Sequence, residues 1–105
     1  MGKVIDLEDK MEMTDDQLWG LIIQYGTFYD RKFRHIWKLH AEKEEIIGRL
    51  SIRACEARNK YRSLKKKRAT MRTYIIAAFR NCMENYRQYL WVRQVKWPMA
   101  RITKC

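Results

Sequence analysis

The stretch Arg58–Arg68, RNKYRSLKKKR, concentrates side chains that bind anions. Lysine and arginine hold phosphate oxygens, arginine pairs with the edge of guanine, and asparagine pairs with adenine. On a helix with about 100° per residue, Tyr61 and Leu64 fall on the inward face and the polar side chains lie on or beside the outward face. We expect Arg62 to read bases and the lysines to hold phosphates. The candidate DNA-binding residues are Arg58, Asn59, Arg62, Ser63, Lys65, Lys66 and Lys67.

The charge of the chain is distributed unevenly along its 105 residues, which carry a net charge of +11. Residues 53–73 hold nine Lys or Arg and one Glu, a net charge of +8. Residues 1–16 hold two Lys and six Asp or Glu, a net charge of −4. A basic cluster of this size attracts nucleic acid, an anionic membrane or an acidic protein surface. A solvated face on a purely structural helix is the alternative, and the shortage of carboxylates favours a bound polyanion.

Other chemistry finds little support in the sequence. His35 and His40 lie five residues apart, which does not match the i, i+4 spacing of a helical metal pair. The chain has no glycine-rich phosphate loop, and we expect no enzyme activity, metal, cofactor or small-molecule substrate. Three widely spaced cysteines indicate a reducing compartment, nucleus or cytosol. The longest apolar run is too short for a membrane span, so no membrane partner is expected.

Helical elements must position these residues, and the first is indicated by a capping box from Thr14 to Gln17. Gly26 is expected to end this helix. Residues 27–30 then form a loop, with Asp30 capping a helix over residues 31–50 that breaks near His40.

The basic helix begins at Ser51 as its N-cap in this interpretation, and its apolar stripe continues beyond Tyr61. No Gly or Pro follows until Pro98, but a helix that long is unusual in a small domain, so we expect a turn near residues 69–73. The predicted fold is all-α, a compact three-helix bundle with a C-terminal extra helix. The predicted divisions are a flexible acidic leader, 1–13, a helical domain, 14–97, and a flexible tail, 98–105.

The order of these features resembles the MADF domain, a Myb/SANT-like module of chromatin and transcription proteins. The resemblance rests on three segments within residues 17–90: Leu21-Ile22, Phe28-Tyr29-Asp30, and Tyr61-Arg62-Ser63-Leu64-Lys65. Tyr61 stands where the family has tryptophan, and the second helix lacks the tryptophan expected for the family, with Ile46 or Ile47 nearest. The resemblance implies helix-turn-helix-like DNA binding, with protein–protein interaction as a second use and no catalysis.

Two apolar segments predict protein contacts. Val4, Ile5 and Leu7, beside Asp6 and Glu8, are similar to a SUMO-interacting segment, and a plain acidic leader is the alternative. Near the C-terminus the apolar side chains exceed what a three-helix core needs. We expect Tyr86, Tyr89 and Leu90 to pack on the first helix. Trp91, Val95 and Trp97 would then bind a partner or a second copy, with burial in the core as the alternative.

Two functions therefore remain open from the sequence. The first is a DNA-binding domain of a nuclear transcription or chromatin regulator, whose basic helix reads duplex DNA. The second is a chromatin-associated interaction module that docks a nuclear protein or forms a homo-oligomer through its C-terminal aromatic helix.

Overall fold

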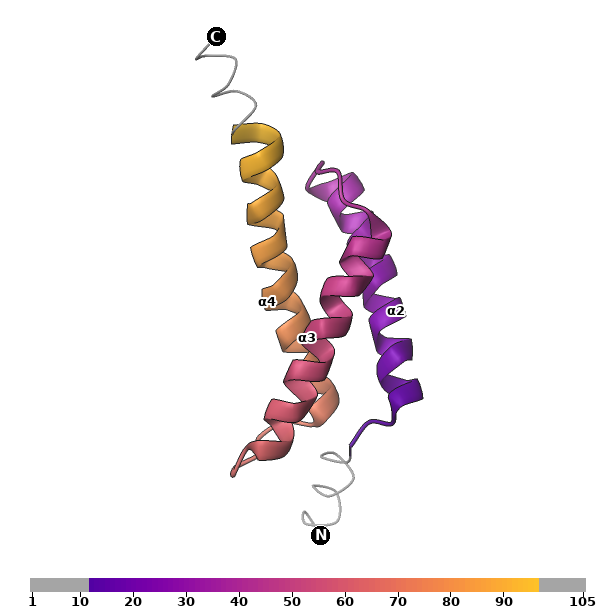
Figure 1. The fold of residues 1–105 in the computed structure, drawn as a ribbon, viewed down its shortest axis with the longest axis vertical. Helices are drawn as coiled ribbons and strands as arrows, with labels where there is room; N and C mark the ends of the chain where they lie inside the picture. Colours follow the sequence, from indigo (N-terminus) through magenta and orange to yellow (C-terminus); the bar gives the residue numbers. More distant parts are fainter. Residues whose placement is uncertain (1–11, 97–105) are drawn as a thin grey trace.

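The computed structural model describes residues 12–96, which form three long helices and no strand. Helices α2 (Asp15–Arg31) and α4 (Met71–Trp91) run in one direction, and α3 (Lys43–Ser63) runs antiparallel to both (Figure 1). Two π-helical turns, η1 (Lys32–Ile36) and η2 (Val92–Lys96), continue α2 and α4 without a break. The predicted all-α bundle is confirmed. One helix, α3, crosses the boundary that was predicted at Ser51, so α4 is the third helix and not an extra one.

Helix α2 begins as its sequence predicts. The side chain of Thr14 accepts from the backbone N–H of Gln17, and the Gln17 side chain accepts from the N–H of Thr14. Two of the unpaired N–H groups at the helix start are thereby satisfied. Met13 and Leu18, on either side of this cap, are both buried, as a hydrophobic staple requires.

Helix α2 does not stop at Gly26, and the prediction of a loop over residues 27–30 is wrong. Tyr25, Tyr29 and Phe33 lie on one face, and continuing the helix packs all three rings against the other helices or their connections. Gly26 allows α3 to approach closely, because a Cβ there would lie 2.8 Å from Cγ1 of Ile47. Tertiary packing therefore overrides the local preference of glycine for helix ends.

The connection between α2 and α3 confirms the predicted break near His40. Trp37 closes η1 by donating its N–H to the carbonyl of Lys32, and Lys38 takes a positive φ of 57°. The N–H of Leu39 then reaches back to the carbonyl of Phe33, and the Leu39 side chain is buried. Helices often end at a residue with left-handed backbone angles, which is usually glycine. Here that residue is Lys38, and the next side chain, Leu39, is buried.

Helix α3 contains Ser51 instead of starting there. The Ser51 hydroxyl donates to the carbonyl of Ile47, 2.7 Å away, so it does not act as an N-cap. Glu42 occupies the N-cap position without a side-chain bond. The helix that carries the basic residues therefore has its N-cap at Glu42, nine residues before the predicted N-cap at Ser51.

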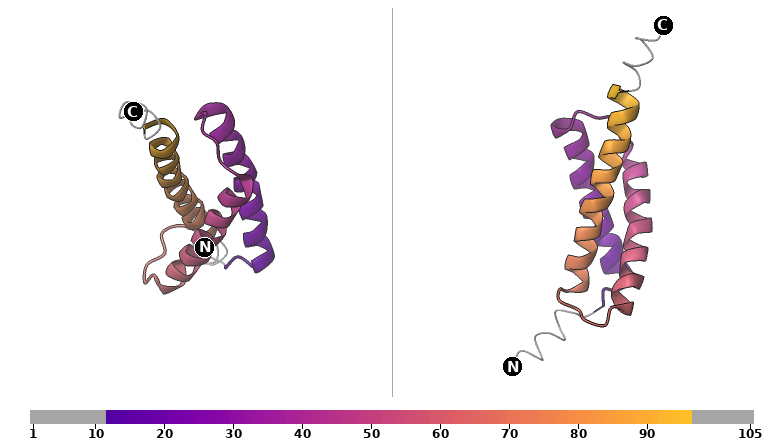
Figure 2. Two further views of the ribbon diagram at one scale, coloured as in Figure 1. Left: turned by 45° about the horizontal axis from the view of Figure 1, so that its top comes forward. Right: turned by 90° about the vertical axis from the view of Figure 1, so that its left-hand side faces the viewer.

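The three helices lie side by side (Figure 2), and the core contains buried side chains from all of them. Tyr61 is buried, as predicted, and Leu64 packs against the core while partly exposed. Tyr86 and Leu90 are buried, which agrees with the prediction for the C-terminal segment, but Tyr89 is 45% exposed. The fully buried large side chains are Tyr61, Phe33, Phe79, Leu21, Ile46, Leu50, Met71, Ile75 and Met83.

Candidate nucleic-acid interface

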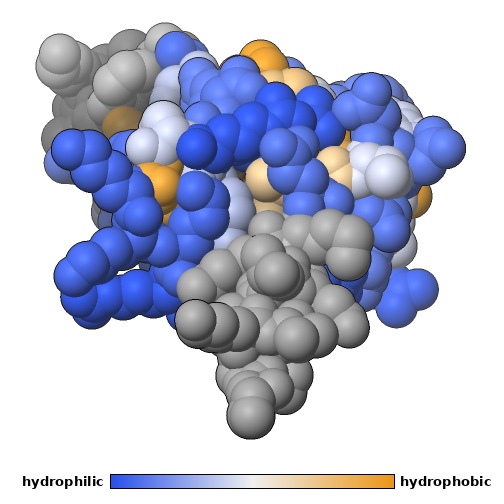
Figure 3. Space-filling view, turned by 90° about the horizontal axis from the view of Figure 1, so that it is seen from below, coloured by the Kyte–Doolittle hydropathy of each residue, from blue (hydrophilic) through white to orange (hydrophobic). Residues whose placement is uncertain are grey.

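One end of the bundle gathers exposed cations from three consecutive pieces of chain. These pieces are the last turns of α3, the loop of residues 64–70, and the first turn of α4, which meet at the lower end in Figure 1. Seen from that end, the surface is dominated by hydrophilic side chains (Figure 3). We call five exposed residues without a recorded ion pair inside the described part of the chain the basic end: Lys60, Lys65, Lys66, Arg68 and Arg72.

Lys65, Lys66 and Lys67 lie in the loop, so their predicted place on the outward face of a helix is wrong. Helix α3 ends at Ser63, and Leu64 already has extended backbone angles of −70° and 134°. Four successive cations after Leu64 would repel those one turn earlier if the helix continued. The Tyr61 hydroxyl fixes the loop instead by donating to the carbonyl of Ala69, 2.6 Å away.

Helix α4 begins beside this loop with a second concentration of positive potential. Thr70 is its N-cap and accepts from the N–H of Thr73. The first turn holds Arg72 and no acidic residue, although the positive end of a helix dipole favours carboxylates. From residue 57 to residue 83 the sequence has nine Lys or Arg and no Asp or Glu. The nearest acidic residues along the sequence are therefore Glu56 and Glu84, on either side of the segment that carries the basic end.

Arg62, the predicted base-reading residue, and Arg58, a predicted DNA-binding residue beside it, both form ion pairs within the molecule. Arg58 Nη1 lies 2.8 Å from Oδ1 of Asp15, at the start of α2. Arg62 Nη2 lies 2.6 Å from Oε1 of Glu12, and this hydrogen bond raises the pKa of Arg62. The start of α2 thus supplies the counter-charges for this face of α3.

Three further predicted DNA-binding residues, Asn59, Ser63 and Lys67, also make hydrogen bonds within the protein. The Asn59 side chain accepts a long hydrogen bond of 3.4 Å from Arg62, and the Ser63 hydroxyl donates to the carbonyl of Lys60. Lys67 Nζ donates to the carbonyl of Leu64 and lies 5.5 Å from the centre of the Tyr61 ring. Lys67 therefore helps to close the end of α3, whereas Lys65 and Lys66 remain exposed.

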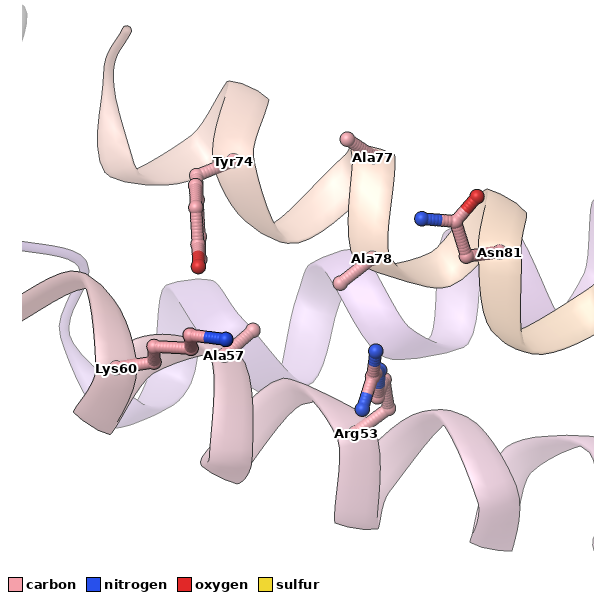
Figure 4. A pocket seen from close by; sticks show the side chains of 7 residues that line it. All are labelled: Arg53, Ala57, Lys60, Tyr74, Ala77, Ala78 and Asn81. Atoms are coloured by element: carbon pink, nitrogen blue, oxygen red, sulfur yellow. The ribbon is translucent and has the colours of Figure 1, made fainter. Parts of the chain in front are cut away.

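A groove of about 270 Å³ runs between α3 and α4 next to the basic end. Small side chains line it, Ala57 from α3 and Ala77 and Ala78 from α4, and Ala78 points toward α3 whereas Ala77 points away from it (Figure 4). Arg53 and Lys60 come from α3, at the spacing i, i+4, i+7 with Ala57, and Tyr74 and Asn81 come from α4. In Figure 4 the Arg53 side chain points toward α4 and the Tyr74 ring toward α3, whereas Lys60 extends along α3 toward Ala57 and Asn81 lies along α4.

The predicted partner-binding residues lie at the opposite end of α4. Trp91 is 48% exposed and Val95 is 36% exposed. Trp91 also lines an open hollow of about 410 Å³ with Arg87, Gln88 and Val92. Trp97 and the possible SUMO-interacting segment, Val4, Ile5 and Leu7, lie outside the described residues, as do most of the predicted leader and tail.

Metal binding, membrane crossing and cysteine chemistry are all disfavoured by the sequence. Within residues 12–96, no three His, Cys, Asp or Glu side chains come together as they would around a metal ion. Over the same stretch, none of the helices combines the length and apolar character needed to cross a membrane. Cys55 is exposed and Cys82 is half-buried, and burial raises the pKa of the Cys82 thiol.

Sequence reasoning missed part of this interface. Arg68 and Arg72 join the basic end only because the chain turns at residues 64–70, and Arg53, Tyr74 and Asn81 meet only because α3 and α4 pack in one register. The absence of Asp and Glu from 57 to 83 was a readable signal for Arg72. Comparisons of the chain with protein-family models, curated proteins and solved structures gave no match, so the resemblance to MADF domains stays a prediction.

Proposed function

We propose that this chain binds duplex DNA through phosphate contacts of the basic end, as a DNA-binding domain of a nuclear regulator. The observation that carries the proposal is the gathering of Lys60, Lys65, Lys66, Arg68 and Arg72 at one end of the bundle, with no acidic residue between 57 and 83. Lysine and arginine contacts to phosphate supply most of the affinity of proteins for nucleic acid of any sequence.

The geometry favours phosphate binding over base reading. A base-reading helix needs free side chains on its outward face, and here Arg58 and Arg62 are held by Asp15 and Glu12. The free cations sit on a loop and on the two helix ends beside it. We therefore propose that the basic end sits against the DNA backbone, with affinity that depends little on base sequence.

A salt titration with random duplex DNA tests this proposal. With about five phosphate contacts, the logarithm of affinity should fall with the logarithm of salt at a slope of roughly −4 to −5. The triple variant Lys65→Gln, Lys66→Gln, Arg68→Gln should bring the slope to about −2. The matched control is Arg31→Gln, Lys38→Gln, Lys43→Gln, which removes three exposed cations at or near the other end of the bundle.

Two results would reject the proposal. One is a folded parent protein that fails to bind duplex DNA at low salt. The other is equal weakening by the two triple variants, which would assign binding to net charge and not to the basic end.

The second candidate function is a chromatin-associated interaction module, and the half-exposed Trp91 favours it. An exposed tryptophan beside Val95 and an open hollow is the kind of surface that proteins use for contacts. The two functions occupy different ends of α4, so one chain can carry both.

A further inference from the structure

The groove between α3 and α4 has the features of a site for a small anionic group. Its volume of about 270 Å³ lies just below the range of roughly 300–1,000 Å³ typical of pockets for drug-sized ligands. The three alanines that line it contribute no polar atom beyond the backbone, so the polar side chains decide what it binds. Those side chains are a guanidinium, an ammonium, a phenol and an amide, the kinds of donor that hold phosphate in protein–DNA complexes.

Most of these donors have no partner inside the described part of the chain. Neither the Lys60 ammonium, the Tyr74 hydroxyl nor the Asn81 amide makes a recorded side-chain hydrogen bond within residues 12–96. The Tyr74 ring is positioned by Tyr61, whose centre lies 5.5 Å away. Arg53 meets Glu56 at 3.4 Å, but both side chains are about half exposed, and such pairs contribute little.

The groove is also continuous with the basic end. Lys60 belongs to both, since it lines the groove and lies one turn before the loop. No residue that lines the groove is acidic. A strand of nucleic acid held by Lys65, Lys66 and Arg68 can therefore continue past Lys60 toward Arg53, whose exposed pairing with Glu56 offsets its charge only weakly.

We infer that the groove holds a backbone phosphate of the bound nucleic acid, between Lys60 and Arg53 of α3 and between Tyr74 and Asn81 of α4. The inference rests on the proposed function and adds to it a defined phosphate site away from the loop. It makes the α3–α4 face, and not only the end of the bundle, part of the contact.

An asparagine pair on α4 gives a sharp test. Asn81→Asp places a carboxylate in the groove with almost no change of shape, and Asn85→Asp makes the same change one turn away, outside the groove. Both side chains are exposed. Affinity for a random duplex at low salt should fall roughly tenfold in Asn81→Asp, because a hydrogen bond to phosphate is replaced by repulsion, and about two- to threefold in Asn85→Asp.

A second pair of variants, which leaves the charge unchanged, controls for a folding defect in Asn81→Asp. Tyr74→Phe removes only the hydroxyl in the groove, and Tyr89→Phe removes a hydroxyl from an exposed ring at the far end of α4. Duplex affinity should fall about threefold in Tyr74→Phe and stay unchanged in Tyr89→Phe, with both variants folded by circular dichroism.

The possible failures separate the two proposals. If the parent binds DNA and the loop triple variant weakens it, but both members of each pair behave alike, the groove inference is overturned and the basic end stands. If the parent does not bind DNA at all, the proposed function falls and the groove inference falls with it. Selective weakening by Asn81→Asp and Tyr74→Phe supports both.

Discussion

Arg58 on α3 and Asp15 at the start of α2 form an ion pair of 2.8 Å that joins two helices across 43 residues of sequence. The Arg58 side chain is only 16% exposed, whereas that of Asp15 is 90% exposed. One partner is therefore mostly enclosed and the other can be removed without opening the core. The pair also places the Asp15 carboxylate beside the C-terminal half of α3, close in sequence to Lys60 of the basic end.

Asp15→Asn should lower stability and raise affinity for duplex DNA. It leaves Arg58 without its counter-charge, so the free energy of unfolding should fall by about 0.5–1 kcal/mol, and the released guanidinium should strengthen DNA binding. The control is Asp16→Asn, which removes the same charge from the same first turn of α2. Chemical denaturation and a duplex titration measure both effects. Identical behaviour of the two variants would show that the ion pair has no energetic role.

Gly26→Ala and Gly20→Ala should change stability in opposite directions. Both glycines lie inside α2, where alanine is preferred by roughly 1 kcal/mol. A Cβ at position 20 meets nothing within 4 Å, but at position 26 it lies 2.8 Å from Ile47 Cγ1. We expect Gly20→Ala to stabilise, and Gly26→Ala to be less stable than Gly20→Ala by about 1–3 kcal/mol. Equal denaturation midpoints would contradict the close approach of α2 and α3.

Tyr61→Phe should loosen the loop that carries the basic end. The change deletes the hydrogen bond to the Ala69 carbonyl, which should cost about 0.5–1.5 kcal/mol, and leaves the buried ring in place. Amide exchange of residues 65–69 should accelerate more than exchange in the middle of α3. Tyr74→Phe serves as the control, because its hydroxyl makes no recorded hydrogen bond within the described residues. Unchanged exchange in the loop would count against the tether.

The stability of the protein should decline in alkaline solution. Burial raises the pKa of Tyr61 above the ordinary value of 10.0, and it does the same for Tyr29 and Tyr86. The folded chain then keeps phenolic protons that the unfolded chain loses. Stability is consequently full below pH about 10 and decreases as the pH rises through the higher folded values. Denaturation midpoints at pH about 8 and about 11 measure the decline, which Tyr61→Phe should reduce.

Trp91→Glu should weaken any association of the chain without unfolding it. Trp91 is half exposed, so the charge should change stability by no more than about 0.5 kcal/mol. Sedimentation over a range of concentrations compares the parent with Trp91→Glu and with Trp19→Glu, which alters a tryptophan of similar exposure on α2. We expect a lower apparent mass only for Trp91→Glu. A monomeric parent that also retains no partner in pull-down would remove the second candidate function.

Local signals in the sequence predicted the features that local chemistry decides. The Thr14–Gln17 capping box and the connection near His40 appear where they were expected. The end of α2 did not, because Gly26 serves an approach to Ile47 that no local pattern reveals. The turn after α3 was predicted at 69–73 and occupies residues 64–70, since no glycine or proline marks its start.

The candidate site, too, could be predicted from the sequence only in part. The charge of residues 53–73 was readable, and it led to the prediction of an anionic partner. The pairing of Arg58 with Asp15 depends on the register of α2 against α3, and the groove depends on the register of α3 against α4. These registers are set by the packed core, so the free cations could not be told from the paired ones in advance.

Gln94 and His40 hold the far end of the bundle together. The Gln94 side chain accepts from the His40 N–H at 2.8 Å and donates to the His40 carbonyl at 2.6 Å. One amide side chain thus satisfies both backbone polar groups of His40. Residues 40 and 94 are 54 apart in sequence, and unwinding of η2 would remove both hydrogen bonds from the connection between α2 and α3. We therefore expect the end of the third helix and the first interhelical turn to open together, and the exchange of the His40 backbone amide to report on both.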